Sequence, residues 1–218
     1  MADEPTKSRR GCFFYGCIAS SVLLLVILIA GIVGMRYAKR MFNEFTDTQP
    51  SQFPAVKLSA ADLEKLEQRI ETFREAVRQH KGTPPLELTP DEINGLIATD
   101  PDMKPLKGKL YVTAIEEGRF KGEVSVPMEE AGLPLFKGRY LNGAGTFALS
   151  LRNGLLRLTI SEARVKGKPV PEVYMQKIRN QNLAHNINTD ARAQVALDAL
   201  ESIELKPGKL VIVPKLNR

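Results

Sequence analysis

The residue types on which most enzyme chemistry depends are scarce in this chain. Its 218 residues include only two cysteines and two histidines, Cys12, Cys17, His80 and His185. A nucleophile needs a base beside it, and a metal ion needs several ligands. The sequence contains no H-E-x-x-H, no G-x-S-x-G and no phosphate-cradling glycine loop. We therefore expect no catalytic residue, no metal ligand and no cofactor, and predict that the protein is not an enzyme.

Neighbouring carboxylates are the remaining candidates for catalysis. Glycoside hydrolysis uses two carboxylates that face one substrate. Adjacent acids at turns normally point into solvent, and the chain offers no substrate-binding aromatic residues beside them. We therefore interpret these acids as surface residues. They are Glu116-Glu117, Glu129-Glu130, and Asp100 with Asp102.

A loose series of glycines stands at Gly138, Gly143 and Gly145. A phosphate-binding loop would continue into Lys-Ser or Lys-Thr and then a helix, but this series precedes a predicted strand. We interpret the glycines as bulge or close-packing positions.

A run of 25 residues, 11–35, carries no charge. As a helix it would reach about 37 Å, enough to cross the roughly 30 Å hydrocarbon layer of a bilayer. We predict a transmembrane helix. A cleaved secretory signal is the alternative, but its apolar core is only about 7–15 residues long and ends at small residues. This run is longer and passes Gly31 and Gly34 without a good cleavage site.

The two cysteines precede or open the apolar run. A bacterial lipoprotein needs its acylated cysteine after such a run, so Cys12 and Cys17 stand in the wrong order. No histidine accompanies them to form a metal site. We interpret them as small apolar residues at a helix start, with reversible acylation at the membrane edge as the alternative.

The orientation follows from the lengths of the flanking segments more than from their charges. Lys7, Arg9 and Arg10 are balanced by Arg36, Lys39 and Arg40, so the positive-inside rule is nearly neutral. A short N-terminal tail usually stays in the cytoplasm, and long following domains are exported. We expect a cell-membrane protein with a cytoplasmic tail (1–10), a single span (11–35), a linker (36–57) and an extracytoplasmic domain (58–218).

The charge distribution argues against nucleic acid as a partner. Residues 1–40 hold six Lys and Arg against two Asp and Glu, and the rest of the chain holds 25 against 23. The basic character therefore belongs largely to the anchor. Short basic groups remain in the domain, which we interpret as solvated surface, with contact to anionic lipid headgroups as the alternative. They are Lys104, Lys107 and Lys109; Arg164, Lys166 and Lys168; and Lys206, Lys209, Lys215 and Arg218.

Two helices are predicted ahead of the first strands. An apolar stripe marks a helix over 59–81, with Ser59 as its N-cap. The stripe lasts about two heptads, too short for a coiled coil, so we expect it to pack on the core. In 86–97, Thr89 and Glu92 form a capping box around Pro90. Asn94, on the short helix that follows, points to solvent or ties a neighbouring loop by hydrogen bonds, and we favour the tie.

From residue 110 on, the apolar period changes from about 3.6 to 2. Three hairpins are predicted, at 110–126, 144–165 around Asn153-Gly154, and 203–213 around Pro207-Gly208. Two short helices, 172–183 and 190–200, separate the last two hairpins. The expected fold is α+β, with an N-terminal transmembrane helix followed by an antiparallel, hairpin-rich sheet packed with several helices.

Several motifs follow one another in the order seen in a known family. The pattern L-x-L-T-x-x-E-I-N-x-L-I at 86–97 leads to Val124-Ser125-Val126-Pro127 and then Gly138-Arg139-Tyr140-Leu141-Asn142. An Asn-Gly turn and Val165-Lys166-Gly167-Lys168-Pro169-Val170-Pro171 complete the series. This succession resembles the uncharacterised YpmS-type bacterial proteins. The resemblance covers about 86–213 and implies one membrane anchor and a small extracytoplasmic domain, without catalytic residues.

Two classes of function remain. In the first, the domain is a non-enzymatic envelope module that binds a lipid or a membrane-protein partner through an apolar groove. In the second, it is an envelope hydrolase or transferase whose carboxylates come together only in three dimensions. The expected partners are the lipid bilayer and a lipid or envelope-protein ligand.

Overall fold

The chain divides into two compact units, residues 1–44 and 45–218. Its computed structural model describes residues 10–130 and 137–215, with side chains from residue 23 onward except residue 41. The first unit contains helix α1 (Arg10–Phe45). This helix runs past the expected linker start at residue 36, because no proline or glycine follows Gly34 until Pro50. The second unit begins at residue 45, ahead of the expected domain start at 58.

The expected membrane span, 11–35, lies within α1, but its side chains are described only from residue 23 onward. Among the described residues, no helix is long and apolar enough to cross a membrane. The side chains of 11–22, the first part of the expected span, lie outside the described set, as do Cys12 and Cys17.

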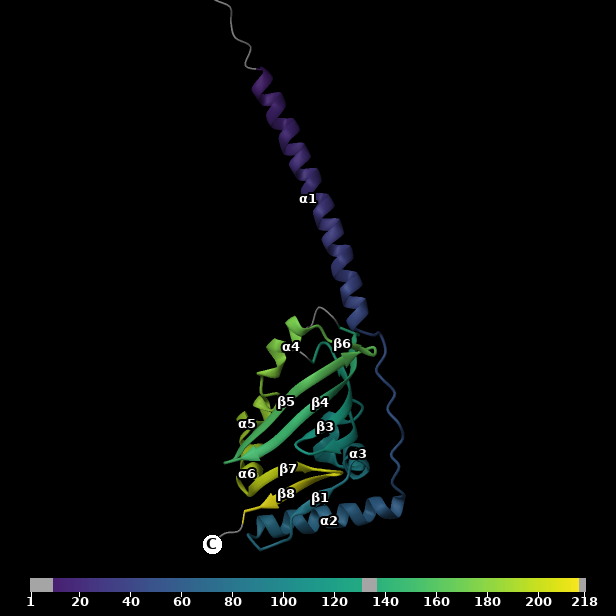
Figure 1. Cartoon of the computed structure of the whole chain (residues 1–218), viewed down its shortest axis with the longest axis vertical. Helices are drawn as coiled ribbons and strands as arrows, with labels where there is room; N and C mark the ends of the chain where they lie inside the picture. The colour runs from purple at the N-terminus through teal and green to yellow at the C-terminus, as the bar shows by residue number, and fades with distance from the viewer. Residues whose placement is uncertain (1–9, 131–136, 216–218) are drawn as a thin grey trace, which may run out of the picture. The chain divides into compact units, whose positions relative to one another are not determined.

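The second unit contains an antiparallel sheet of eight strands, in which β4 is the longest (Figure 1). Strand β3 pairs along the first half of β4, β7 touches its far end at Leu151, and β5 runs along its other edge. The three expected hairpins are present as β2–β3, β4–β5 and β7–β8. The strands are β1 (Leu86–Leu88), β2 (Leu110–Glu116), β3 (Arg119–Pro127), β4 (Tyr140–Arg152), β5 (Leu155–Val165), β6 (Lys168–Pro169), β7 (Leu200–Lys206) and β8 (Lys209–Pro214).

The α+β class with an antiparallel sheet is therefore confirmed. Three helical segments precede the first hairpin, namely α2 (Ala60–Arg78), α3 (Pro90–Thr99) and the short 3-10 helix η1 (Pro101–Leu106). The two helices expected after the second hairpin appear as three, α4 (Glu172–Arg179), α5 (His185–Thr189) and α6 (Ala191–Asp198). Helices α4 and α5 lie beside β5, and α6 contacts β7 (Figure 1). The last expected helix ends early because Leu200 already belongs to β7.

The core lies between the sheet and these helices. Helix α2 buries Leu66, Ile70 and Phe73 against Leu86 and Leu88 of β1, so its stripe packs within the domain as expected. Two further clusters join β4 and β5 to α6 and β7, and β2 to β7. Their buried members are Leu151, Leu156, Ala184, Leu197 and Ile203, and Val112, Ile115 and Leu205.

Asn94 closes part of the outer edge of β2. Its Nδ2 donates to the Val112 carbonyl, and the Val112 N–H donates to its Oδ1, both at 2.8 Å. The side chain is 5% exposed. Asn94 thus makes the two hydrogen bonds that a neighbouring strand would make. The expectation that its side chain binds another segment by hydrogen bonds is confirmed, and that segment is the edge strand β2.

The outer edge of β5 is closed in the same way by the segment that follows α4. The N–H groups of Leu156 and Leu158 donate to the Oδ1 atoms of Asn188 and Asn182, each at 2.9 Å. Both amides donate back to the Leu156 carbonyl, at 2.7 and 2.9 Å. The Leu183 N–H donates to the Leu158 carbonyl at 2.7 Å. Side chains thus supply most of the pairing that a further strand would give.

Asn94→Ala should lower the free energy of unfolding by roughly 2–4 kcal/mol, because it leaves a buried N–H and C=O of Val112 without partners, at about 1–3 kcal/mol each. Chemical unfolding of the full chain in detergent measures the change. Asn186→Ala is the matched control, since Asn186 is exposed at the start of α5. Equal stability of the two variants would contradict this role for Asn94.

The capping box of α3 should make stability depend on acid pH. Burial alone would raise the pKa of Glu92, but the Thr89 N–H (2.8 Å) and Arg69 (2.7 Å) lower it below its ordinary value. A lowered pKa gives stability that is fully present above the ordinary value, about 4.3, and is lost as the pH falls below it. Glu92→Gln should flatten the unfolding free energy between about pH 5 and 3, whereas Glu64→Gln, at an exposed site on α2, should not. If the unfolding free energy of Glu92→Gln still fell steeply between about pH 5 and 3, Glu92 would not be the source of the acid dependence.

Candidate binding site

The described residues singled out for reactive chemistry belong to several different elements, and all but one are exposed as expected. The exception is Asp100, whose side chain is only 8% exposed because it pairs with Arg74. His80 follows α2 and His185 opens α5, and both are exposed. Of the acidic residues, Glu116 pairs with Lys121, Glu130 with Lys109, and Asp100 and Asp102 with Arg74. Over the described ranges, no three His, Cys, Asp or Glu residues gather in a way that would hold a metal ion.

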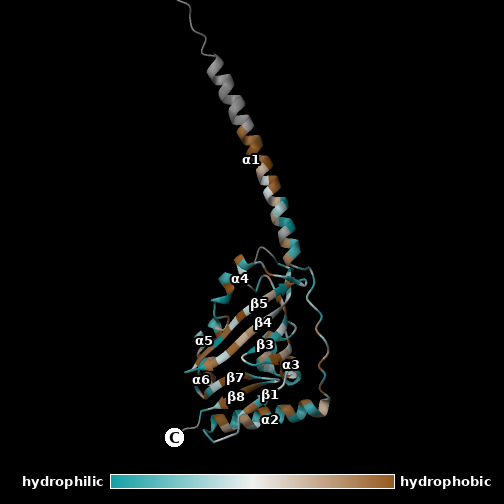
Figure 2. Cartoon of the chain, in the orientation of Figure 1, coloured by the Kyte–Doolittle hydropathy of each residue, from teal (hydrophilic) through white to brown (hydrophobic). Residues whose placement is uncertain are grey.

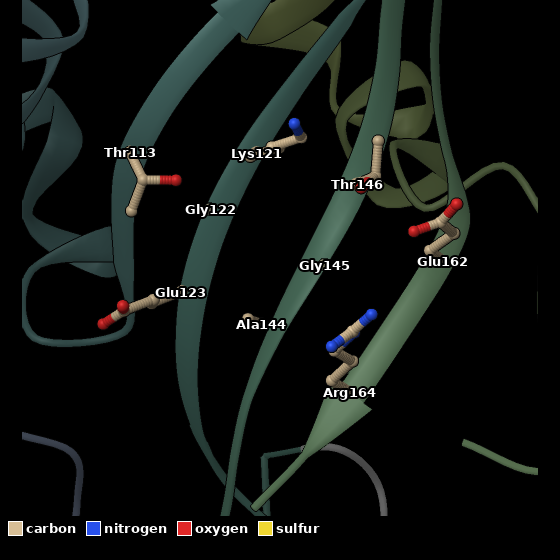
Figure 3. A pocket seen from close by; sticks show the side chains of 9 residues that line it. All are labelled: Thr113, Lys121, Gly122, Glu123, Ala144, Gly145, Thr146, Glu162 and Arg164. Atoms are coloured by element: carbon tan, nitrogen blue, oxygen red, sulfur yellow. The ribbon is translucent and has the colours of Figure 1, made fainter. Parts of the chain in front are cut away.

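The outward face of the sheet carries a polar depression of about 360 Å³ (Figure 3). It lies over β2 to β5, and we call it the polar trough. Two carboxylates, two cations, two threonines and small residues line it. These residues are Thr113, Lys121, Gly122, Glu123, Ala144, Gly145, Thr146, Glu162 and Arg164.

Strand register arranges the charges of the polar trough in two rows. In one row, Glu123 of β3 lies opposite Ala144 of β4, which lies opposite Arg164 of β5. In the next row, Lys121, Thr146 and Glu162 follow in the same order. Each row therefore has opposite charges at its two ends, and the order of signs reverses from one row to the next.

The central strand gives the polar trough its floor. Successive residues of β4 point to opposite faces of the sheet. The two that point outward here, Ala144 and Thr146, are small. Two strand spacings of about 4.8 Å separate β3 from β5, so the charged walls stand roughly 10 Å apart at the backbone. This width suits one extended chain or another narrow polar group lying along β4.

The glycines of these strands serve the core side of the sheet. A side chain on Gly145 would place its Cβ 2.9 Å from the ring of Phe147, and one on Gly143 would place it 2.5 Å from the Arg164 carbonyl oxygen. The Phe147 ring stacks on Phe120 with centroids 5.0 Å apart. Close packing, as expected from the sequence, explains Gly143 and Gly145, whereas Gly138 lies in a turn with a φ of 75°.

One end of the polar trough is bounded by residues 46–53, which we call the strap. The Ser51 N–H donates to Ser125 Oγ at 3.0 Å and to Asn142 Oδ1 at 3.2 Å. Ser125 and Asn142 form the row next to Glu123 and Ala144. Further along the strap, Phe53 stacks on Tyr111 of β2 with centroids 6.0 Å apart.

The start of the strap is held by two basic side chains. Thr46 is only 3% exposed. Arg139 donates to Thr46 Oγ1 at 2.7 Å, and Lys166 lies 3.0 Å from the Asp47 carboxylate. The Asp47 N–H also donates to the Tyr140 carbonyl at 2.9 Å. Residues 46–51, expected to be linker, are therefore built into the domain by polar contacts to β4 and to the β5–β6 turn.

Sequence reasoning did not find the polar trough or the strap. The segment 138–142 was noted as a motif, but nothing in it indicated that Arg139 and Asn142 bind residues more than 90 positions earlier. Glu123, Glu162 and Lys121 were not singled out. Their common signal is a charge at every second position of β3 and β5, on the face opposite the apolar residues.

The polar trough can bind charges of both signs. Carboxylates of Glu123 and Glu162 accept hydrogen bonds, the guanidinium of Arg164 donates them, and the two threonine hydroxyls do both. Lys121 already engages Glu116, and this hydrogen bond lowers the pKa of the Glu116 carboxyl. Both glutamates of the trough are exposed.

No protein-family model, curated protein or solved structure matches this chain. The resemblance to the YpmS-type proteins thus stays a prediction.

Asn142→Asp should release the strap. The Asn142 Nδ2 donates to Asp47 Oδ2 at 3.1 Å and to the Gln49 carbonyl at 2.8 Å. An aspartate cannot donate these bonds and places a second negative charge beside Asp47. We expect faster proteolysis within 46–57 and a loss of about 1–3 kcal/mol of stability. Asn186→Asp makes the same chemical change at an exposed site. Equal cleavage rates in the two variants would show that the strap is held by other means.

Proposed function

We propose that the protein is a membrane-anchored, non-enzymatic protein of the cell envelope, whose extracytoplasmic domain binds a partner in the polar trough. The partner is an extended polar segment of another envelope molecule, with charges of both signs. Two charge rows cross a floor of small residues, and the order of signs reverses from one row to the next; this is the observation that carries the proposal. A polar segment fits these walls better than a lipid chain, so we replace the expected apolar groove with a polar site.

Anchoring through 11–35 is supported by α1 taken alone. The large apolar side chains described over 23–33 are each more than half exposed. Figure 2 colours most of this stretch of α1 as hydrophobic. A contiguous apolar surface of this kind is unfavourable in water. The charge-free run continues back to residue 11 in the sequence, which makes it long enough to span a bilayer.

A hydrolase or transferase is the second candidate. The observation in its favour is that Glu123 and Glu162, from different strands, line the same depression. Removing the negative charge of one glutamate distinguishes a catalytic site from a binding site. Glu123→Gln or Glu162→Gln would abolish catalysis by these carboxylates. Partner binding uses several polar contacts, so each of the two substitutions would only weaken it.

The binding proposal is tested by a photoreactive side chain placed at Thr146, on the floor of the polar trough, in intact cells. We expect it to crosslink a discrete envelope component. The matched control is the same side chain at Ser150, two outward positions further along β4 and outside the trough. Glu162→Lys should reduce the crosslink at Thr146. Equal crosslinking at both positions, or none at Thr146, would overturn the proposed site.

The anchoring proposal is tested by carbonate extraction of membranes. The full-length protein should stay in the membrane fraction, and Leu25→Arg should weaken its insertion by about 2.5–3.5 kcal/mol. Leu25→Ile keeps the apolar character and serves as the control. A soluble form of the unchanged protein that begins near residue 30 or 35 would show cleavage instead.

A further inference from the structure

The charge pattern of the polar trough is complementary to itself. One row carries Glu123 on β3 and Arg164 on β5. The neighbouring row carries Lys121 on β3 and Glu162 on β5. Positive and negative charges therefore alternate around the four corners of the trough (Figure 3). A second trough, turned over onto the first, meets each of these charges with the opposite one.

Two rotations of 180° bring opposite charges together when two such sheets face each other. In the first, the axis runs across the strands, between the two rows. Glu123 then faces Lys121 of the second copy, and Glu162 faces Arg164 of the second copy. In the other rotation the axis runs along β4, so that Glu123 faces Arg164 and Lys121 faces Glu162. Each contact occurs twice, because a two-fold axis makes every contact reciprocal.

The strap selects the first of these rotations. It contacts Ser125 and Asn142, in the row next to Glu123, so it lies at one end of the trough. A rotation about β4 would press the two straps against each other. A rotation about the axis across the strands places each strap beyond the far row of the second copy. The next outward residue of β4 there is Ala148, which is small.

The four charges are accessible for this contact. Glu123, Glu162 and Arg164 are exposed, and no ion pair among the described side chains engages them. Lys121 pairs with Glu116 but keeps 51% of its side chain exposed. Facing sheets lie about 10 Å apart, and the small residues of the floor leave this space to the charged side chains of both sheets.

We infer that the polar trough binds a second copy of this chain, in a symmetric dimer whose two-fold axis runs across the strands. This inference rests on the polar trough being the binding site of the proposed function. Charge pairs across an interface determine which partner fits and in which orientation. The second copy and the envelope partner compete for the same residues, so the partner must displace the second copy to enter the trough.

Sedimentation velocity of the full chain in uncharged detergent micelles tests the dimer, with two variants whose troughs carry charge of one sign. The acidic variant is Lys121→Glu with Arg164→Glu. The basic variant is Glu123→Lys with Glu162→Lys. The control is Glu64→Lys with Glu67→Lys, which makes the same charge change as the basic variant at exposed positions of α2.

We expect the unchanged chain and the control to dimerise, and the dimer to weaken at about 1 M salt, where the Debye length is only about 3 Å. Each one-sign variant should bind itself at least roughly tenfold more weakly, because like charges then face each other. An equal mixture of the two variants should dimerise again. A monomeric unchanged chain, one-sign variants that dimerise as the unchanged chain does, or a mixture that stays monomeric would each overturn the inference.

The orientation is tested by exchanging the two charges of β5, in Glu162→Arg with Arg164→Glu. Positions 162 and 164 face each other across the inferred axis, so this variant should dimerise as the unchanged chain does. With the axis along β4, the exchanged charges would face like charges at Lys121 and Glu123. Loss of the dimer in this variant would therefore overturn the inferred arrangement.

Crosslinking at Thr146 in cells distinguishes failure of the dimer from failure of the proposed function. If the unchanged chain is monomeric but Thr146 crosslinks another envelope component, the dimer alone is refuted. If Thr146 crosslinks only a second copy of the chain, the binding of another envelope molecule is refuted and the dimer is supported.

Discussion

An open antiparallel sheet leaves the backbone N–H and C=O groups of its outer strands without strand partners, and the rest of this fold depends on how they are satisfied. Asparagine side chains meet this requirement, because one amide both donates and accepts as a neighbouring strand does. Asn94 pairs with β2, and Asn182 and Asn188 pair with β5. These bonds fix α3 and the α4–α5 segment against the sheet. They also block strand edges that would otherwise be able to pair with strands of other chains.

This arrangement leaves the outward face of β2 to β5 available for binding. The apolar residues of these strands pack into the core on the opposite face, and the helices lie against that face and the edges. The strap contacts Asn142, beside the charge rows, and Tyr111, which pairs with Glu123 at the β2 side of the first row. The charged residues of both rows still line the open trough. A fourth asparagine, Asn142, thus links the entry of the chain to the border of the candidate site.

Local signals made much of the fold predictable. The Asn153-Gly154 turn has φ values of 52° and 74°, which is the backbone that this pair favours in a hairpin. The capping box predicted α3, and a polar amide between Ile93 and Leu96 pointed to a tie. The polar trough was not predictable, because its walls come from β3 and β5 and depend on the register of both with β4. The strap was missed because its hydrogen-bond partners lie 74 to 120 residues away and Pro50 and Pro54 suggested a linker.

Amide hydrogen exchange tests the edge closure most directly, because it reports on individual N–H groups. The N–H groups of Val112, Leu156 and Leu158 have asparagine oxygens as their acceptors. If the amides close the edges, these three N–H groups exchange as slowly as those in the interior of β4, such as Ala148, which pairs with Thr159 of β5. If they exchange as fast as the exposed amides of the Asn153-Gly154 turn, the edges are open and the account fails.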